Sequence, residues 1–231
     1  MIPEIREDVL RRGITRLCHF TPARNIAHIL TGKTGVLASK HLSSDEREVF
    51  NPTDVQRLDG FPDHVSCSIE YPNGWYFRKA RAKEHLFEDW AVIFLTRDWL
   101  WKRGTKFSQR NAAAGRGRGV SAGIEAFAEL FAPKVVGAYG NLYVRGTRHP
   151  DWLPTDEQAE VLVEDAIALA DITGIAVASL SQARREASRM RLLRQSYPPL
   201  IVAPVLFDAS RLSTLIRLGK RPEEVEYVSD D

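Results

Sequence analysis

The sequence reads Pro154-Thr155-Asp156-Glu157-Gln158-Ala159-Glu160-Val161-Leu162-Val163 where a polar turn runs into a short apolar segment. The apolar half predicts a buried strand whose first outward position is Glu160. Residues two apart in a strand share a face, so we expect Gln158 and Glu160 to point into one cleft and Ala159 to point away. The stretch therefore predicts an amide and a carboxylate side by side at a strand start.

A Gln-x-Glu triplet at a strand start resembles the arrangement that ADP-ribosyltransferases place against the nicotinamide ribose of NAD. Cleavage of the glycosidic bond of NAD passes through a cation-like ribosyl transition state, which a carboxylate beside the ribose stabilises. In this interpretation Glu160 is catalytic and Gln158 orients the acceptor. The triplet by itself also fits a solvated charge that opens an ordinary strand.

A second feature lies near the start of the chain, over Arg16-Leu17-Cys18-His19-Phe20-Thr21. We expect a short strand that ends at His19, followed by a helix with Thr21 as its N-cap and Pro22 in its first turn. The spacing of three apolar residues in that helix predicts one buried face: Ile26, Ile29 and Leu30.

Polar residues of this strand and helix suit the sugar and amide groups of NAD. His19 at the strand end would donate to a ribose hydroxyl, and Asn25 would reach the nicotinamide amide or a neighbouring backbone group. A single histidine beside a strand is commonly structural, so the interpretation depends on its pairing with Glu160.

Together these features resemble the DarT toxins, single-stranded-DNA ADP-ribosyltransferases that are paired with a macrodomain antitoxin. The resemblance covers most of the chain and is most specific in its last block. Its carriers are His19-Phe20-Thr21 with Asn25, Ile26 and Ile29, then Asn51-Pro52-Thr53-Asp54-Val55-Gln56-Arg57, then Val65-Ser66-Cys67-Ser68-Ile69-Glu70-Tyr71-Pro72-Asn73, and Gln158-Ala159-Glu160-Val161-Leu162-Val163.

The resemblance implies roles for individual residues. The catalytic glutamate of the family falls on Glu160, its NAD-binding histidine on His19, and the asparagine of its first helix on Asn25, with Thr21 beside them in the NAD cleft. An arginine that handles the acceptor base falls on Arg57, with Arg47 of the same loop as the alternative. The co-substrate implied is NAD, without a metal.

The block around residue 70 departs from the familiar family pattern, an aromatic followed by Cys-Pro-Arg-Ser. Which tyrosine stacks on nicotinamide is therefore left open: Tyr71 is the first choice and Tyr76 is the second. Trp75, Tyr76 and Phe77 precede Lys79, Arg81 and Lys83 in a segment that reads as a helix with one buried side, which favours packing for Tyr76.

Length and composition predict one catalytic domain over residues 1–231. The chain has 231 residues, 44% of them hydrophobic, and no linker-like segment. No apolar run approaches a membrane span and the polar N-terminus lacks a signal-peptide pattern, so we expect a cytoplasmic protein. Cys18 and Cys67 lie in apolar strand contexts, and neither they nor the histidines have metal-ligand spacing.

The remaining elements predict an α+β fold with a split, largely antiparallel sheet and flanking helices, as in ADP-ribosyltransferases. A Gly-x-Gly-x-x-Gly after a strand is missing from the sequence, which disfavours a Rossmann site. The ranges expected as strands are 90–95, 160–163, 174–179 and 200–207, and those expected as helices are 120–131 and 180–195.

A basic segment lies between Asp98 and Glu125, which have no acidic residue between them. Cations interleaved with aromatics and glycines suit a single-strand groove, where charges follow phosphates and rings stack on bases. A solvated loop anchored by buried tryptophans is the alternative. The cations expected to bind the nucleic acid are Arg110, Arg116 and Arg118, which accompany Lys102, Arg103 and Lys106, and the aromatic residues are Trp99, Trp101 and Phe107.

Three functions remain open at this stage. The resemblance favours a DNA ADP-ribosyltransferase toxin that modifies thymine, with guanine as the acceptor in another branch of the family. An ADP-ribosyltransferase that acts on RNA or protein would need the same His19 and Glu160. A non-catalytic nucleic-acid-binding module would keep the basic segment and have no need of Glu160.

Overall fold

The structure is a computed structural model that describes residues 1–32, 34–43, 57–84 and 88–229. Its largest element is a mixed sheet with the strand order β13-β12-β11-β4-β1-β3-β9-β5-β6 in the described part of the chain. Adjacent strands run antiparallel except β11 and β12, which are parallel. The predicted α+β fold with a largely antiparallel sheet is confirmed.

The strands of the large sheet are β1 (Arg16–Pro22), β3 (His64–Ile69), β4 (Trp90–Thr96), β5 (Lys106–Ser108), β6 (Val120–Ala122), β9 (Glu160–Glu164), β11 (Ile172–Val177), β12 (Leu200–Val202) and β13 (Val225–Glu226). Two small sheets accompany it, formed by β2 (Val36–Leu37) with β10 (Ala166–Ile167) and by β7 (Lys134–Val136) with β8 (Leu142–Val144).

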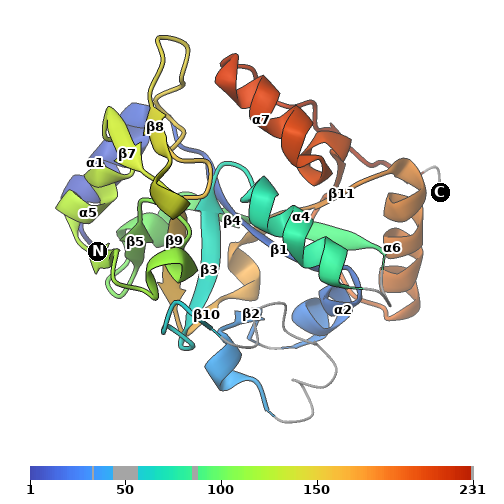
Figure 1. The fold of residues 1–231 in the computed structure, drawn as a ribbon. Coiled ribbons are helices and arrows are strands. Elements are labelled where there is room, and N and C mark those ends of the chain that lie inside the picture. The colour runs from blue at the N-terminus through green and yellow to red at the C-terminus, as the bar shows by residue number, and fades with distance from the viewer. Residues whose placement is uncertain (33, 44–56, 85–87, 230–231) are drawn as a thin grey trace.

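The helices are α1 (Pro3–Arg12), α2 (Arg24–Thr31), α4 (Gly74–Lys83), α5 (Ile124–Glu129), α6 (Leu180–Leu192) and α7 (Ala209–Arg217). Short 3-10 segments cover Ser39–His41, Arg97–Trp101, Ala112–Gly115, Ala138–Gly140, Leu169–Asp171 and Pro204–Phe207. Figure 1 shows α4 passing in front of the sheet with α7 next to it, α6 at one side and α1 with α5 at the other.

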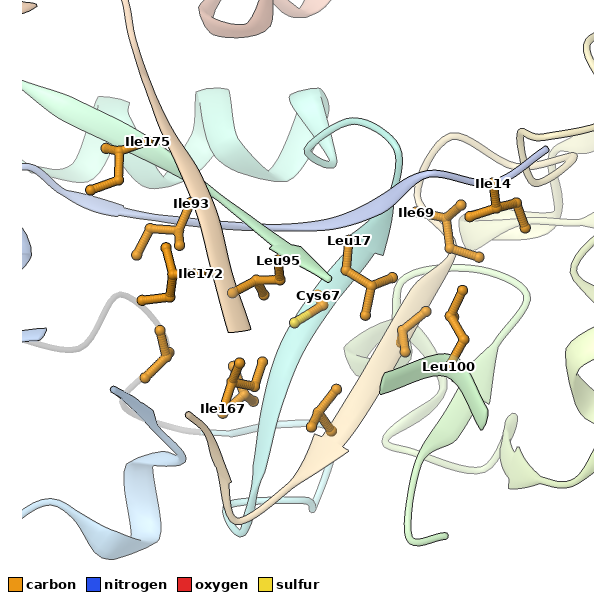
Figure 2. Close-up of a cluster of buried hydrophobic side chains, with 14 of the residues drawn as sticks. Ile14, Leu17, Cys67, Ile69, Ile93, Leu95, Leu100, Ile167, Ile172 and Ile175 are labelled. Carbon is orange, nitrogen blue, oxygen red and sulfur yellow. The ribbon is translucent and has the colours of Figure 1, made fainter. Parts of the chain in front are cut away.

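The inner strand β4 shows that the sheet is covered on both faces. Its run Trp90-Ala91-Val92-Ile93-Phe94-Leu95 is buried throughout, and alternate residues enter two different apolar clusters. Ile93 and Leu95 join the cluster of Figure 2, where side chains of β1, β3 and β11 surround them. Val92 and Phe94 point the other way, toward α4 and α7. A strand buried on both faces lacks the polar alternation of a surface strand. The strand expected over residues 90–95 is confirmed.

The sheet is split between β1 and β3. These strands pair only at Leu17 with Ile69 and at Cys18 with Ser68, whereas β1 and β4 pair over all seven residues of β1. From His19 onward β1 is paired only with β4, whereas the preceding part of β3 is paired with β9. The two halves of the sheet therefore diverge at His19, which leaves room for a cavity between them.

Three sequence expectations about elements need correction. Residues 120–131 form β6 and then α5, because Gly123 at φ 95° breaks the run that was expected to be one helix. The strand expected over 200–207 ends at Val202, since Pro204 lacks an amide hydrogen and opens a 3-10 turn. The strand expected over 174–179 begins and ends two residues earlier, and Ser179 caps α6.

Candidate functional site

A cavity of about 360 Å³ lies at the split of the sheet. This volume is in the range of small-molecule sites. The lining mixes apolar and polar side chains from β1, α2, β3, β9 and the loops between them. It includes six of the residues expected from the sequence: His19, Thr21, Asn25, Arg57, Tyr76 and Glu160.

His19 occupies the first position at which β1 and β3 no longer pair. Its Nδ1 lies 2.9 Å from the carbonyl oxygen of Ser66 on β3. Burial lowers the pKa of His19 below its usual 6.5, and the cation of Arg57 lowers it further, although the Ser66 carbonyl acts in the opposite direction. A neutral imidazole that donates from Nδ1 leaves Nε2 as an acceptor. His19 is therefore set to accept a hydrogen bond, not to donate one as the sequence suggested.

Thr21 and Asn25 form one polar unit on the same wall of the cavity. The Asn25 side-chain amide donates to the Thr21 hydroxyl at 2.9 Å. Thr21 is not the helix cap that the sequence predicted, because β1 continues through Pro22 and Ala23 is the N-cap of α2. The threonine hydroxyl thus orients Asn25 instead of capping the helix. We call the segment Arg16–Thr31 the β1–α2 wall.

Glu160 is the first residue of β9 and faces the cavity with only 9% of its surface exposed. It pairs with Ser108 of β5, which brings the loop after β5 over its side chain. There the Asn111 side-chain amide donates to Glu160 Oε1 at 2.9 Å. Asn111 also lines the cavity and was missed in the sequence, because its position depends on a strand pairing between residues about fifty apart.

Gln158 does not share the cleft with Glu160. The strand begins only at Glu160, and Gln158 lies in the preceding turn, where its backbone amide donates to Asp156 Oδ1 at 2.9 Å. The alternation of strand side chains therefore does not apply to it, and Gln158 does not line the cavity. Ala159 does turn away, into the apolar core.

Arg57 lines the cavity from a tight turn that precedes β3. Its guanidinium makes a two-pronged contact with Asp59, at 3.1 Å from Nε and 2.9 Å from one terminal nitrogen. It also donates to the carbonyl oxygens of Phe61 and His64. Asp59 is 4% exposed, so this ion pair is largely desolvated and holds the guanidinium in one orientation.

The two candidate tyrosines lie in different places. Tyr71, the first choice, packs edge-on against Trp152 in the apolar cluster beneath α7 and does not line the cavity. Tyr76, the second choice, is half-buried on α4, lines the cavity and has its ring 6.0 Å from that of Phe20. The structure thus reverses the order of preference.

The basic segment borders the cavity without presenting the aromatic rings that were expected. Trp101 and Phe107 are buried in the core, and Trp99 is covered by the Lys102 ammonium at 3.2 Å from its ring centroid. These rings anchor the segment, as the alternative interpretation held. Base stacking on Trp101 and Phe107 is therefore excluded.

Three cations of that segment lie outside the cavity lining. Arg110 donates to the carbonyl oxygens of Val136 and Gly137 at 3.2 and 3.4 Å, and Arg116 and Arg118 are exposed. Two other residues of the same loop, Asn111 and Ala113, do line the cavity. We call residues 57–61 and 111–119 together the loop wall.

Some expectations fall outside what the structure describes. The block Asn51–Gln56 and the alternative Arg47 lie outside the described residues. The described residues contain no group of three or more His, Cys, Asp or Glu side chains that could hold a metal ion. The helices in that part of the chain all lack the long apolar run that a membrane span requires.

The sequence matches the model of a protein family described as ssDNA thymidine ADP-ribosyltransferase, DarT, over residues 18–208. The chain belongs to the DarT family. The matched range contains both His19 and Glu160 and ends before α7. A comparison with curated proteins gave no match.

Solved DarT structures resemble the fold. Thermus sp. 2.9 DarT in complex with NAD+ has 19% sequence identity and a TM-score of 0.54, with 84% of this chain and 97% of that chain covered. The same Thermus protein with ADP-ribosylated ssDNA gives 14% identity and a TM-score of 0.54 over the same shares. Thermosipho africanus DarTG in complex with ADP-ribose gives 14% and 0.55, covering 84% of this chain and 51% of that chain. The expected ADP-ribosyltransferase fold is confirmed.

Proposed function

We propose that this DarT-family chain transfers ADP-ribose from NAD+ to a thymine base in single-stranded DNA, with Glu160 as its catalytic residue. The observation that carries the proposal is the convergence of His19, Arg57 and Glu160 on one cavity from three separate parts of the sequence. The solved Thermus DarT structures with NAD+ and with ADP-ribosylated ssDNA support the choice of both substrates.

The residues of the cavity suit NAD+. His19 Nε2 accepts a hydrogen bond from a ribose hydroxyl, and its neutral state avoids repulsion with the positive nicotinamide ring. Glu160 holds the 2′-hydroxyl of the nicotinamide ribose and stabilises the positive charge that develops as nicotinamide leaves. Asn111 donates to one carboxylate oxygen of Glu160 and so orients the carboxylate at the cavity. Tyr76 supplies a ring at the wall where nicotinamide would stack.

Arg57 acts on the acceptor. The bond between ribose C1′ and nicotinamide breaks, a bond from C1′ to a thymine ring nitrogen forms, and the proton of that nitrogen is released. Arg57 does not take the proton, because a guanidinium is always protonated. It stabilises the deprotonated ring instead, from a position that Asp59 fixes. A base in a duplex would first have to be flipped at a cost of a few kcal/mol, which favours single strands.

The same proposal extends to the biology of the chain. Unchecked modification of DNA would harm the cell that makes the enzyme, so we propose that the chain is the toxin of a pair. Its antitoxin would carry a macrodomain that removes the ADP-ribose, and the solved Thermosipho africanus DarTG structure supports this pairing. We also propose that the whole of residues 1–231 is one catalytic domain and that it acts in the cytoplasm, where NAD+ and chromosomal DNA are found.

Intact-mass measurement of oligonucleotides tests the function. Wild type and Glu160→Gln are incubated with NAD+ and three single strands: DNA with one thymidine, the same DNA with that thymidine replaced by deoxyguanosine, and a matched RNA. The proposal expects the mass of one ADP-ribose to be gained by the thymidine strand with wild type only. If the deoxyguanosine strand or the RNA were labelled instead, the acceptor would be guanine or RNA and not thymine in DNA. Failure of wild type to consume NAD+ would contradict the proposal that the chain is an enzyme.

A further inference from the structure

The two loops of the loop wall are locked together beside the cavity. Gly117 has φ +75°, and a Cβ at this position would lie 2.1 Å from the Asp59 carbonyl oxygen and 3.0 Å from the ring of Phe61. Such distances leave room only for glycine. The loop that carries Asn111 and Ala113 therefore packs directly on the turn that carries Arg57.

That turn fixes an apolar side chain on its outer side. The Gly60 amide donates to the Arg57 carbonyl oxygen at 2.8 Å, which closes the turn, and Arg57 itself takes a φ of 39°. Asp59 points inward to the Arg57 guanidinium, whereas Leu58 between them is 55% exposed. Leu58 is therefore exposed, whereas the side chains on either side of it, Arg57 and Asp59, line the cavity.

An exposed leucine alone is ordinary, but its neighbours give this one a chemical context. Arg116 and Arg118 flank Gly117 and are exposed. Because Gly117 lies against the Asp59 carbonyl, these two exposed cations and the exposed Leu58 come from adjoining backbone, next to a cavity that must receive a base in the proposed function. A single strand of DNA offers the complement, since its base faces are apolar and its phosphates are negative.

We propose that Leu58 packs against the base next to the target thymidine while Arg116 and Arg118 follow the phosphates. The target base must leave its stack to reach Arg57 and Glu160, and its neighbour then loses a stacking partner. Leu58 takes the place of that partner, as apolar side chains do where they separate stacked bases. This inference rests on the proposed function and names the residue that separates the target base from the strand.

A comparison of protein and DNA changes tests the contact. The proteins are wild type, Leu58→Ala, Leu58→Phe and the control Leu192→Ala, which changes a leucine that is 85% exposed on α6. The substrates are oligonucleotides with one thymidine, either intact or with an abasic site directly 5′ or directly 3′ of that thymidine. The readouts are KM for the oligonucleotide and, separately, the Kd for NAD+.

With intact DNA, Leu58→Ala should raise KM by roughly 5-fold or more, the effect of losing one base contact. Leu58→Phe should match or improve on wild type, and Leu192→Ala should leave KM unchanged. With one of the two abasic oligonucleotides, wild type and Leu58→Ala should become equal, because the partner base is gone. The Kd for NAD+ should stay the same in each protein.

Two results would overturn the inference while the proposed function stands. One is an unchanged KM for Leu58→Ala on intact DNA. The other is the same loss for Leu58→Ala on intact DNA and on both abasic oligonucleotides, which would show that Leu58 acts without a neighbouring base. Failure of wild type to modify intact DNA would overturn both the inference and the proposed function, and the wild-type reaction reveals that failure by itself.

Discussion

The β1–α2 wall and the loop wall hold their polar side chains in different ways. In the β1–α2 wall, His19 is fixed by a backbone carbonyl of the neighbouring strand and Asn25 by a threonine one helical turn away. In the loop wall, Arg57 is held by the buried carboxylate of Asp59 and by the carbonyl oxygens of Phe61 and His64, and Asn111 holds Glu160 across a strand pairing. Regular structure thus fixes the polar groups of the β1–α2 wall, whereas contacts between side chains and between loops fix those of the loop wall.

This difference predicts separable effects of mutation. Changes in the β1–α2 wall should act on NAD+ binding, whereas changes in the loop wall should act on transfer to DNA. Glu160 lies where the two walls meet, so its loss should have the largest effect.

Replacement of Glu160 by glutamine should lower kcat by about 100-fold to 1000-fold, the usual cost of removing one group that stabilises a developing charge. Glutamine keeps the side-chain length and an oxygen that can accept from Asn111, so the fold and the melting temperature should be retained. Single-turnover rates with saturating NAD+ and DNA measure the effect. A variant that keeps more than a tenth of the wild-type rate would remove Glu160 from the chemistry.

Asn111 should have the next largest effect, because it donates to the carboxylate of Glu160. Loss of a hydrogen bond to a charged group costs about 1.5–3 kcal/mol, so Asn111→Ala should slow transfer by roughly 10-fold to 100-fold. Asn111→Asp should be slower still, since it sets a second negative charge beside Glu160. The neighbouring Ala114→Ser, an exposed change in the same loop, serves as the control.

Asp156 gives a prediction about stability in the loop that leads to Glu160. Burial raises the pKa of this carboxyl from 3.8 to about 6, and the charge of Glu157 adds to the effect, while the Gln158 amide and Arg110 oppose it. A raised pKa means that the folded state loses stability as pH rises from about 4 to above 6. Asp156→Asn should therefore stabilise the protein by about 1–3 kcal/mol at pH 8 and by little at pH 4. Urea unfolding at the two pH values measures the difference, and equal gains at both would contradict the assignment.

Asp59→Asn should have a smaller, selective effect. The change removes the charge that orients Arg57 but keeps an oxygen that can accept from it. We expect kcat for DNA to fall by about 10-fold, within the range for loss of a charge-assisted hydrogen bond, and the Kd for NAD+ to stay constant. A Kd for NAD+ that weakens by the same factor as kcat falls would show that the loop wall also shapes the NAD+ site.

His19 should give the smallest change, in a pH profile. Its pKa is lowered from the usual 6.5 by burial, so the ring keeps its acceptor to a lower pH than an exposed histidine would. The Kd for NAD+ should therefore be flat from pH 8.5 down to about neutral pH in wild type and weaken only at a lower pH than the usual pKa would give. A Kd that weakens as pH falls from 8.5 to 6.5 would mean that His19 titrates normally.

The difference between the walls also explains what the sequence could reveal. Strands β1, β4 and β9 were predictable because short apolar runs flanked by polar turns mark them, and His19 and Glu160 follow from family motifs on those strands. Thr21 was misplaced because β1 runs to Pro22 and does not end at His19. Gln158 was misplaced because strand alternation was applied to a residue that precedes the start of β9. Tyr71 was preferred over Tyr76 because residues 75–83 read as a helix with one buried side, which favoured packing for Tyr76.

The loop wall was harder to predict for a physical reason. The contact of Asn111 with Glu160 requires β5 to pair with β9, and the contact of Gly117 with Asp59 joins loops about sixty residues apart. Local patterning carries no signal for either contact. The buried state of Trp101 and Phe107 likewise depends on strands and helices elsewhere in the fold.

The Arg57→Gln variant tests the division between the walls most directly. Two quantities are measured: its Kd for NAD+, by calorimetry, and its rate of thymidine modification. The account predicts a Kd for NAD+ close to that of wild type, together with a loss of DNA modification. A Kd weakened as much as the rate, in a variant whose melting temperature is unchanged, would contradict it.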